Sequence, residues 1–196
     1  MLSIALAEAQ VRPRLAPWAD RLTVGVVNAP DSCVASGDLD ALEELERSLG
    51  ADGVRCRRVN IGFAAHSAHM DGILQAFRDA LAGLRADAGA IPFYSSVTGE
   101  RLDGSALDAS YWCRNLREVV QFGRAVKTLL DDGHGVFVEL GGHPALTAVL
   151  SSTSADAVGV QGAVVGSLRR DDGGVATLHR NLGVLHTHGY AVPWAA

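Results

Sequence analysis

The segment from Asn60 to Met70 carries the residue best suited to proton transfer, His66. A β-like run over residues 54–60 precedes it, and an amphipathic helical pattern over residues 70–84 follows, so we expect His66 at a strand-to-helix junction. Ser67 is predicted to cap this helix, whose partially positive start would hold the imidazole neutral. A neutral imidazole can accept a proton, so His66 is a candidate general base. The alternative is a satisfied histidine at a helix cap with no chemical role.

The residues around His66 are small. Gly62, Ala64 and Ala65 place little side-chain bulk beside the histidine. Such a turn is typical of a site that another molecule must approach closely.

A histidine of this kind is half of an acyl-transfer or hydrolase-like dyad, and the other half is a serine or cysteine nucleophile. The sharp turn that presents such a serine, Gly-x-Ser-x-Gly, does not occur in the sequence. Cys113 lies in an aromatic helical segment, and we expect it to pack in a core rather than act as a thiol nucleophile.

Two histidine pairs raise the possibility of a metal site. His66 and His69 are close together near a helix start, and His186 and His188 lie near the C-terminus. No carboxylate or thiolate stands beside either pair at the spacing of metal ligands, so no metal is expected.

The composition describes a globular protein. Of 196 residues, 48% are hydrophobic and 20% are charged, and the formal net charge is -5. This charge gives no basic footprint for nucleic acid or an anionic membrane, and no apolar run is long enough to span a bilayer. The odd number of widely spaced cysteines argues against a disulfide framework and favours the reducing cytoplasm; they are Cys33, Cys56 and Cys113.

The first 60 residues have the periodicity of a small α+β unit with the order βαββαβ. This order predicts a ferredoxin-like arrangement, in which two helices cover one face of an antiparallel sheet. Asp38 is the predicted N-cap of the second helix, and Gly50 its predicted end. The expected elements are strand 2–7, helix 8–18, strand 22–27, strand 32–36, helix 38–49 and strand 54–60.

From His66 onward the pattern is that of an α/β unit. The run over residues 135–140 has no polar alternation, which is typical of a strand in a parallel sheet covered on both faces. The other expected elements are helix 70–84, strand 91–97, a helix capped by Asp108, helix 122–130, a helix after Pro144, a loop over 151–162, strand 163–168 and helix 174–188.

Five ordered motifs give the chain a family resemblance. They are Phe63-Ala-Ala-His66-Ser67, Pro92-Phe-Tyr-Ser-Ser-Val-Thr-Gly99, Tyr111-Trp-Cys-Arg-Asn-Leu-Arg117, Val136-Phe-Val-Glu139 with His143-Pro144-Ala-Leu146, and Val165-Gly-Ser-Leu-Arg-Arg-Asp171. In this order and spacing they resemble the C-terminal part of the acyltransferase domain of a modular type I polyketide synthase, in the malonyl-CoA:acyl-carrier-protein transacylase family. The resemblance covers essentially the whole chain.

The resemblance implies three parts. A ferredoxin-like small subdomain would span residues 1–60, and the C-terminal part of an α/β-hydrolase-like acyltransferase subdomain would span residues 61–162. Residues 163–196 would then form a terminal strand, a helix and the start of the linker that follows such domains.

The resemblance also implies a ping-pong reaction that serves antibiotic biosynthesis. An (alkyl)malonyl extender would pass from coenzyme A to an active-site serine, and then to the phosphopantetheine thiol of an acyl carrier protein. His66 matches the family's catalytic base, and Asn115 matches the position whose main-chain carbonyl accepts the second ring N–H. Acyl-CoA is a substrate and phosphopantetheine belongs to the carrier partner, so no cofactor of the chain's own is expected.

The family's Gly-His-Ser-x-Gly segment, oxyanion hole and extender-binding arginine would all lie upstream of Met1. We therefore expect a truncated acyltransferase that needs a missing N-terminal segment, or a ketosynthase-linked chain, for activity. The alternative is a catalytically silent remnant or scaffold that contacts a carrier protein.

The residues before His66 bear on the choice of extender. Malonyl-selective relatives resemble His-Ala-Phe-His at these four positions and methylmalonyl-selective ones Tyr-Ala-Ser-His, whereas this chain has Phe63, Ala64 and Ala65 before His66. Because Ala65 leaves empty the space that a phenyl ring would fill, a methylmalonyl or larger extender is expected.

Overall fold

The structure is a computed structural model that describes residues 1–155 and 162–194. Contacts within the chain divide it into two units, residues 1–128 and 129–196. Helix α5 (Phe122–Asp131) runs from the first unit into the second. The three-part division at residues 60 and 162 stays a prediction.

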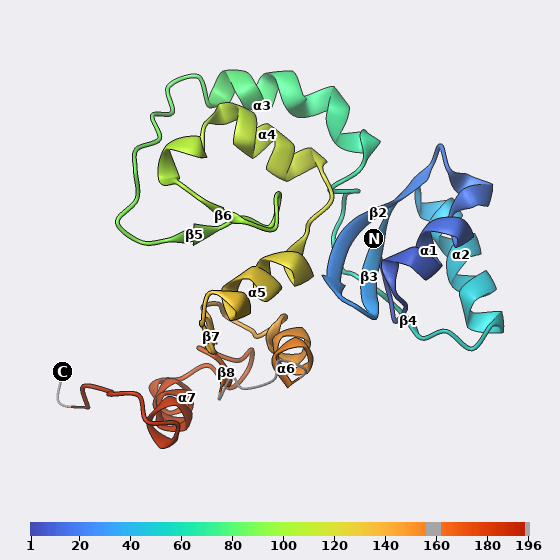
Figure 1. Ribbon diagram of the computed structural model, residues 1–196. Helices are drawn as coiled ribbons and strands as arrows, with labels where there is room; N and C mark the ends of the chain where they lie inside the picture. The colour runs from blue at the N-terminus through green and yellow to red at the C-terminus, as the bar shows by residue number, and fades with distance from the viewer. Residues whose placement is uncertain (156–161, 195–196) are drawn as a thin grey trace. The chain divides into compact units, whose positions relative to one another are not determined.

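The first unit contains a four-stranded antiparallel sheet with the order β2-β3-β1-β4. Helices α1 and α2 lie together on one face of it (Figure 1). The elements follow one another as βαββαβ, so the predicted ferredoxin-like arrangement is confirmed. Their bounds are β1 (Leu2–Ile4), α1 (Glu8–Arg14), a 3-10 turn (Ala16–Trp18), β2 (Leu22–Ala29), β3 (Ser32–Gly37), α2 (Leu39–Ala51) and β4 (Cys56–Arg58).

The core of this sheet lies between the strands and the two helices. Alternation along β3 sends Cys33 and Ala35 into that core, and it sends Ser36 to the opposite face. The apolar side chains of α2 recur at helical spacing, as the sequence predicted. The buried members are Leu2, Ile4, Val11, Leu15, Leu22, Val24, Cys33, Ala35, Ala41, Leu42, Leu45 and Leu49.

The predicted start of α2 is confirmed, whereas its capping contact and its end differ from the prediction. Asp38 occupies the N-cap position, but its carboxylate binds Arg21 and His69 instead of a helix N–H. The helix continues through Gly50 to Ala51, and the chain turns at Gly53, whose φ of 73° is in the left-handed region that favours glycine.

The predicted strand 54–60 is shorter than expected. Strand β4 (Cys56–Arg58) lies at the edge of the antiparallel sheet, as the ferredoxin-like arrangement predicts. Residues 59–67 connect β4 to a 3-10 turn (Ala68–Ile73), and only then does α3 (Leu74–Ala80) begin. Gly72 explains why the predicted helix 70–84 starts with a tight turn, because glycine favours a regular α-helix poorly.

The rest of the first unit is a helical layer with a small hairpin. Helix α3 packs on α4 (Ala109–Arg117), whose N-cap Asp108 accepts from the Tyr111 N–H at 2.8 Å, as predicted. The predicted strand 91–97 is reduced to β5 (Phe93–Tyr94), paired with β6 (Arg101–Leu102). A 3-10 turn (Gly104–Ala106) follows the hairpin.

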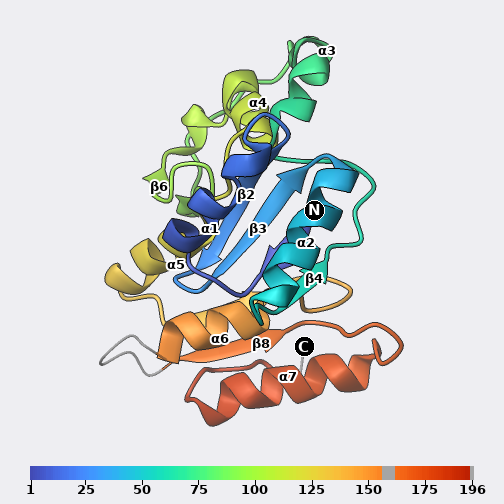
Figure 2. The same ribbon diagram turned by 90° about the vertical axis from the view of Figure 1, so that its right-hand side faces the viewer.

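The second unit contains two parallel strands, β7 (Val136–Glu139) and β8 (Ala163–Gly166). Helices α6 (Thr147–Ala155) and α7 (Val175–Thr187) flank β8 on opposite sides (Figure 2). The parallel pairing agrees with the apolar run over residues 135–140, although Val138 in β7 is 44% exposed. The predicted loop from residue 151 is wrong up to Ala155, since α6 extends to that residue, and the rest of that loop up to residue 161 lies outside the described residues.

Candidate active site

The main chain at His66 adopts a conformation that is uncommon for residues other than glycine. Its φ is 57°, in the left-handed region. Three hydrogen bonds hold the turn: the His66 N–H donates to the Leu116 carbonyl at 3.2 Å, Ser36 Oγ donates to the Ala65 carbonyl at 2.6 Å, and Ser67 Oγ donates to the Ala64 carbonyl at 2.7 Å. The surrounding structure thus fixes a backbone that would otherwise be sparsely populated.

The imidazole of His66 has a defined orientation. Its Nδ1 lies 3.1 Å from the Glu118 carbonyl oxygen. A carbonyl can only accept, so Nδ1 must carry the hydrogen in this contact, which leaves Nε2 of the neutral ring as a lone-pair acceptor. This is the tautomer that a general base acting through Nε2 requires.

Burial lowers the pKa of His66 below its usual value, although the Glu118 and Asn115 carbonyls oppose the change by hydrogen bonding to the ring. The ring is therefore mainly neutral at pH 7. The sequence argument expected the neutral state from the helix start, whereas the cause in the structure is burial.

The predicted neighbour Asn115 lies at the end of α4, and its main-chain carbonyl contributes to the environment of the ring. The carbonyl that the structure places 3.1 Å from Nδ1 belongs to Glu118. Sequence reasoning missed Glu118, because a main-chain acceptor carries no signature in the side-chain pattern. The Glu118 carboxylate points to Arg114, with Nε and Oε1 2.8 Å apart.

Strand β2 supports the segment that carries Glu118. The Val120 N–H donates to the Gly25 carbonyl at 2.9 Å, and the Val27 N–H donates to the Val120 carbonyl at 2.8 Å. Val120 therefore extends the sheet beside β2 as an isolated parallel bridge to Val26. The sheet thus positions two parts of the site. Ser36 on β3 holds the His66 turn, and Gly25 on β2 holds the segment whose Glu118 carbonyl accepts from the ring.

Ser67 has the predicted capping role at the start of the following turn. Its hydroxyl accepts from the His69 N–H at 3.3 Å, while it donates to the Ala64 carbonyl. Among the residues that the structure describes, no serine or cysteine side chain is hydrogen-bonded to His66, so the nucleophile of a dyad is not brought to the ring by this part of the chain.

The three residues predicted to shape the extender pocket differ in their exposure. Phe63 is 54% exposed, Ala64 is half-buried and Ala65 is 6% exposed. Ala65, the residue directly before the base, is therefore the most buried of the three.

A cavity of about 220 Å³ adjoins the His66 turn. Ser67 and His69 contribute from the turn, Ser36 from β3, and Arg117 from the end of α4. Two of the polar side chains that line this cavity have acidic partners: His69 Nε2 lies 2.7 Å from Asp38 Oδ1, and Arg117 Nε lies 2.5 Å from Asp71 Oδ1. The His69 side chain is 46% exposed, and the sequence did not predict its contact with Asp38.

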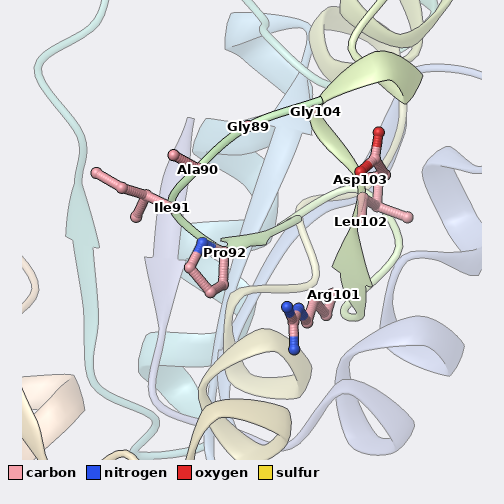
Figure 3. A pocket seen from close by; sticks show the side chains of 8 residues that line it. All are labelled: Gly89, Ala90, Ile91, Pro92, Arg101, Leu102, Asp103 and Gly104. Atoms are coloured by element: carbon pink, nitrogen blue, oxygen red, sulfur yellow. The ribbon is translucent and has the colours of Figure 1, made fainter. Parts of the chain in front are cut away.

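A second cavity, of about 370 Å³, lies at the β5–β6 hairpin (Figure 3). Arg101 and Asp103 are its charged lining residues, and the Asp103 carboxylate is engaged by the Ser105 N–H at 2.9 Å. The predicted site residues are not part of this lining. The remaining members are Gly89, Ala90, Ile91, Pro92, Leu102 and Gly104.

Other histidines have structural neighbours. His188 Nδ1 lies 2.9 Å from the Val184 carbonyl oxygen, and the ring centroids of His186 and Trp194 are 5.7 Å apart. Within residues 1–155 and 162–194, no group of three or more His, Cys, Asp and Glu residues could hold a metal ion.

A search of the same residues finds no helix with the length and apolar character needed to cross a bilayer.

Comparison with known proteins gives matches along the whole chain. The profile described as "Acyl transferase domain" matches residues 1–192. The chain is 43% identical to the polyketide synthase GfsA of Streptomyces halstedii over 196 residues, which are 100% of this chain and 3% of that protein.

Solved structures match in fold as well. The acyltransferase domain from module 8 of the salinomycin polyketide synthase is 45% identical with a TM-score of 0.93, over 98% of this chain and 45% of that one. The acyltransferase domain of SpnD, solved in complex with 2-(pent-4-yn-1-yl)malonyl, is 30% identical with a TM-score of 0.81, over 96% of this chain and 46% of that one. The chain spans less than half the length of these two solved chains and a small share of GfsA. Since the profile covers nearly every residue, the chain belongs to the acyl transferase domain family, as its resemblance to the acyltransferase domains of polyketide synthases predicted.

Proposed function

We propose that His66 is the general base of a transfer that moves an (alkyl)malonyl extender from coenzyme A to a serine, and from there to an acyl carrier protein. The observation that carries the proposal is the hydrogen bond of Nδ1 to the Glu118 carbonyl, which leaves Nε2 unprotonated. The lowered pKa of His66 supports it, because the base must be neutral at the start of each half-reaction.

In the first half-reaction, Nε2 of His66 takes the proton of the serine hydroxyl as its oxygen attacks the thioester carbonyl. The tetrahedral intermediate collapses, the carbon–sulfur bond breaks, and the imidazolium returns the proton to the departing coenzyme A thiolate. In the second, Nε2 takes the proton of the carrier phosphopantetheine thiol, the sulfur attacks the acyl-serine carbonyl, and the carbon–oxygen bond to serine breaks as the imidazolium returns the proton to the serine oxygen. The Glu118 carbonyl keeps the ring oriented throughout and stabilises the imidazolium.

The nucleophile is supplied by the Gly-His-Ser-x-Gly segment of the family, in the same or another chain. We test this by mixing the chain with a polypeptide that carries that segment and measuring acyl loading from labelled acyl-CoA. Recovered loading that His66→Gln abolishes supports the assignment. Loading that never recovers favours a silent scaffold that contacts a carrier protein, and loading that survives His66→Gln contradicts the assignment of the base.

The extender is proposed to be methylmalonyl or a larger alkylmalonyl group. The small side chain of Ala65 directly before the base supports this choice, and so does the likeness to the SpnD domain, whose complex holds a malonyl group with a five-carbon substituent. An Ala65→Phe substitution in the reconstituted enzyme should shift the preference toward malonyl. An unchanged ratio of malonyl to methylmalonyl loading in a folded Ala65→Phe variant contradicts the pocket assignment, and Ala65→Ser is the matched control.

The cytoplasm is the proposed compartment. Three cysteines without disulfides support it: Cys33, Cys56 and Cys113. Burial raises the pKa of Cys33 to about 11, so this thiol is unreactive at neutral pH.

A further inference from the structure

We propose that Ser36, with Gly25 beside it, is a positioning residue for His66. The inference rests on the proposed function, because it names the residues that set the location of the proposed base. Both residues belong to neighbouring strands of the sheet and lie on the face opposite α1 and α2.

Ser36 is fully buried, with an exposed fraction of 0%. Its hydroxyl donates to the carbonyl of Ala65 at 2.6 Å, across 29 positions of sequence. Ala65 directly precedes His66, so this bond fixes the peptide group that carries the catalytic residue. The bond explains how a serine can be buried at this position, because a buried hydroxyl without a partner is costly.

Gly25 provides the space that this arrangement needs. A Cβ atom at position 25 would lie 3.0 Å from Ser36 Cβ and 3.5 Å from both Cβ and the carbonyl oxygen of His66. The φ of Gly25 is not in the left-handed region, so its backbone conformation does not require glycine. The close approach of Ser36 and His66 does. The Gly25 carbonyl also receives the Val120 N–H, which ties the same residue to the segment that presents the Glu118 carbonyl.

The consequence concerns the left-handed backbone of His66. Such a conformation persists only where its surroundings hold it, and Ser36 holds the Ala65–His66 peptide from the sheet side. Without the Ser36 hydroxyl, the Ala65 carbonyl is free to rotate toward another donor. The ring then shifts relative to the Glu118 carbonyl, and Nε2 leaves the place where a serine hydroxyl would meet it.

The test measures His66 directly in the chain, by NMR titration of labelled histidine rings and by the nitrogen shifts that report the tautomer. The Ser36→Ala variant should move the His66 pKa toward the ordinary value and mix the two ring tautomers. Ser36→Cys, which keeps the shape and a weak donor, should give an intermediate change. Gly25→Ala should shift the same signals by a different route, and it keeps the proposal testable if Ser36→Ala does not fold.

The matched control is Ser95→Ala. Ser95 is also 0% exposed, and its hydroxyl accepts from the Val97 N–H at 3.0 Å, so its loss also removes a buried hydrogen bond. This variant should lower stability while leaving the His66 titration unchanged. Folded Ser36→Ala and Gly25→Ala variants with the parent pKa and tautomer overturn the proposal.

With the serine-bearing polypeptide added, Ser36→Ala should lower the turnover of acyl loading by about 10²-fold and leave KM nearly unchanged, as expected for a misplaced catalytic group. Failure of the proposed function would be recognised separately, because His66→Gln would then leave loading intact while Ser36→Ala still moved the His66 ring signals.

Discussion

The two faces of the antiparallel sheet differ in their role: one packs the core, and the other contacts the His66 turn. The face under α1 and α2 is closed by aliphatic side chains such as Leu42 and Leu45, which pack without hydrogen-bonding demands. On the opposite face, Gly25 leaves room for the His66 turn because it has no side chain, and the Ser36 hydroxyl donates a hydrogen bond to that turn. The same strands therefore stabilise the domain with one side and position the proposed base with the other. We therefore expect substitutions on the helix-covered face to lower stability, and substitutions on the opposite face to lower acyl loading.

The largest effect is expected from His66→Gln. Loss of the general base should lower acyl loading by about 10³-fold in the reconstituted enzyme, within the range measured for general acid–base groups. Urea unfolding of the chain should show a nearly unchanged midpoint, because the ring is only half-buried. If His66→Gln lowered the urea midpoint enough to account for the lost loading, the proposed difference between the two faces would be contradicted.

A large stability effect is expected on the helix-covered face. Leu45→Ala should lower the free energy of unfolding by about 3 kcal/mol, since Leu45 is fully enclosed and its truncation leaves a cavity. Urea denaturation measures the loss, and the His66 NMR titration should keep the parent pKa in the folded fraction. Leu39→Ala is the control, because Leu39 lies on the same helix but is largely exposed.

A smaller effect is expected at the turn itself. Ser67→Ala removes the side-chain acceptor of the His69 N–H and should destabilise the chain by about 1 kcal/mol, as other N-cap losses do. Thermal unfolding gives the shift, and Ser105→Ala in the exposed 3-10 turn is the comparison. An unchanged melting temperature for Ser67→Ala would mean that the cap contributes nothing to the turn.

The smallest effect concerns pH. The pKa of His66 is lowered in the folded state, so the unfolded chain binds more protons below the ordinary value near 6.5. The free energy of unfolding should therefore fall as the pH drops below about 6.5. Above that pH, the contribution of His66 should not change. His66→Gln should flatten that part of the pH profile in urea titrations. A profile with the same slope in both proteins would show that burial of His66 has no energetic consequence.

The sequence predicted the helix-covered face better than the functional face. Periodicity over the predicted strands and over helix 38–49 identified the βαββαβ order, because burial of apolar side chains follows local periodicity. His66 could be singled out from its type and its small neighbours. Its partners could not, because Glu118 acts through a main-chain carbonyl and Ser36 is one strand serine among several.

The errors in local structure have a related cause. The helix predicted from Met70 begins as a 3-10 turn, and strand 91–97 shortens to two residues, because tertiary contacts and tight turns override propensity at element ends. After Ser95, for example, the chain turns, because the Ser95 hydroxyl accepts from the Val97 and Thr98 N–H groups while the Ser95 N–H still donates to the Glu100 carbonyl.

The bridge between Val120 and β2 has a consequence for association. A sheet edge with free N–H and C=O groups is a template on which a second copy of a chain can add a strand. At β2, the Gly25 carbonyl and the Val27 N–H are already occupied by Val120. The contact that orients the proposed base therefore also blunts one edge of the sheet against intermolecular strand addition.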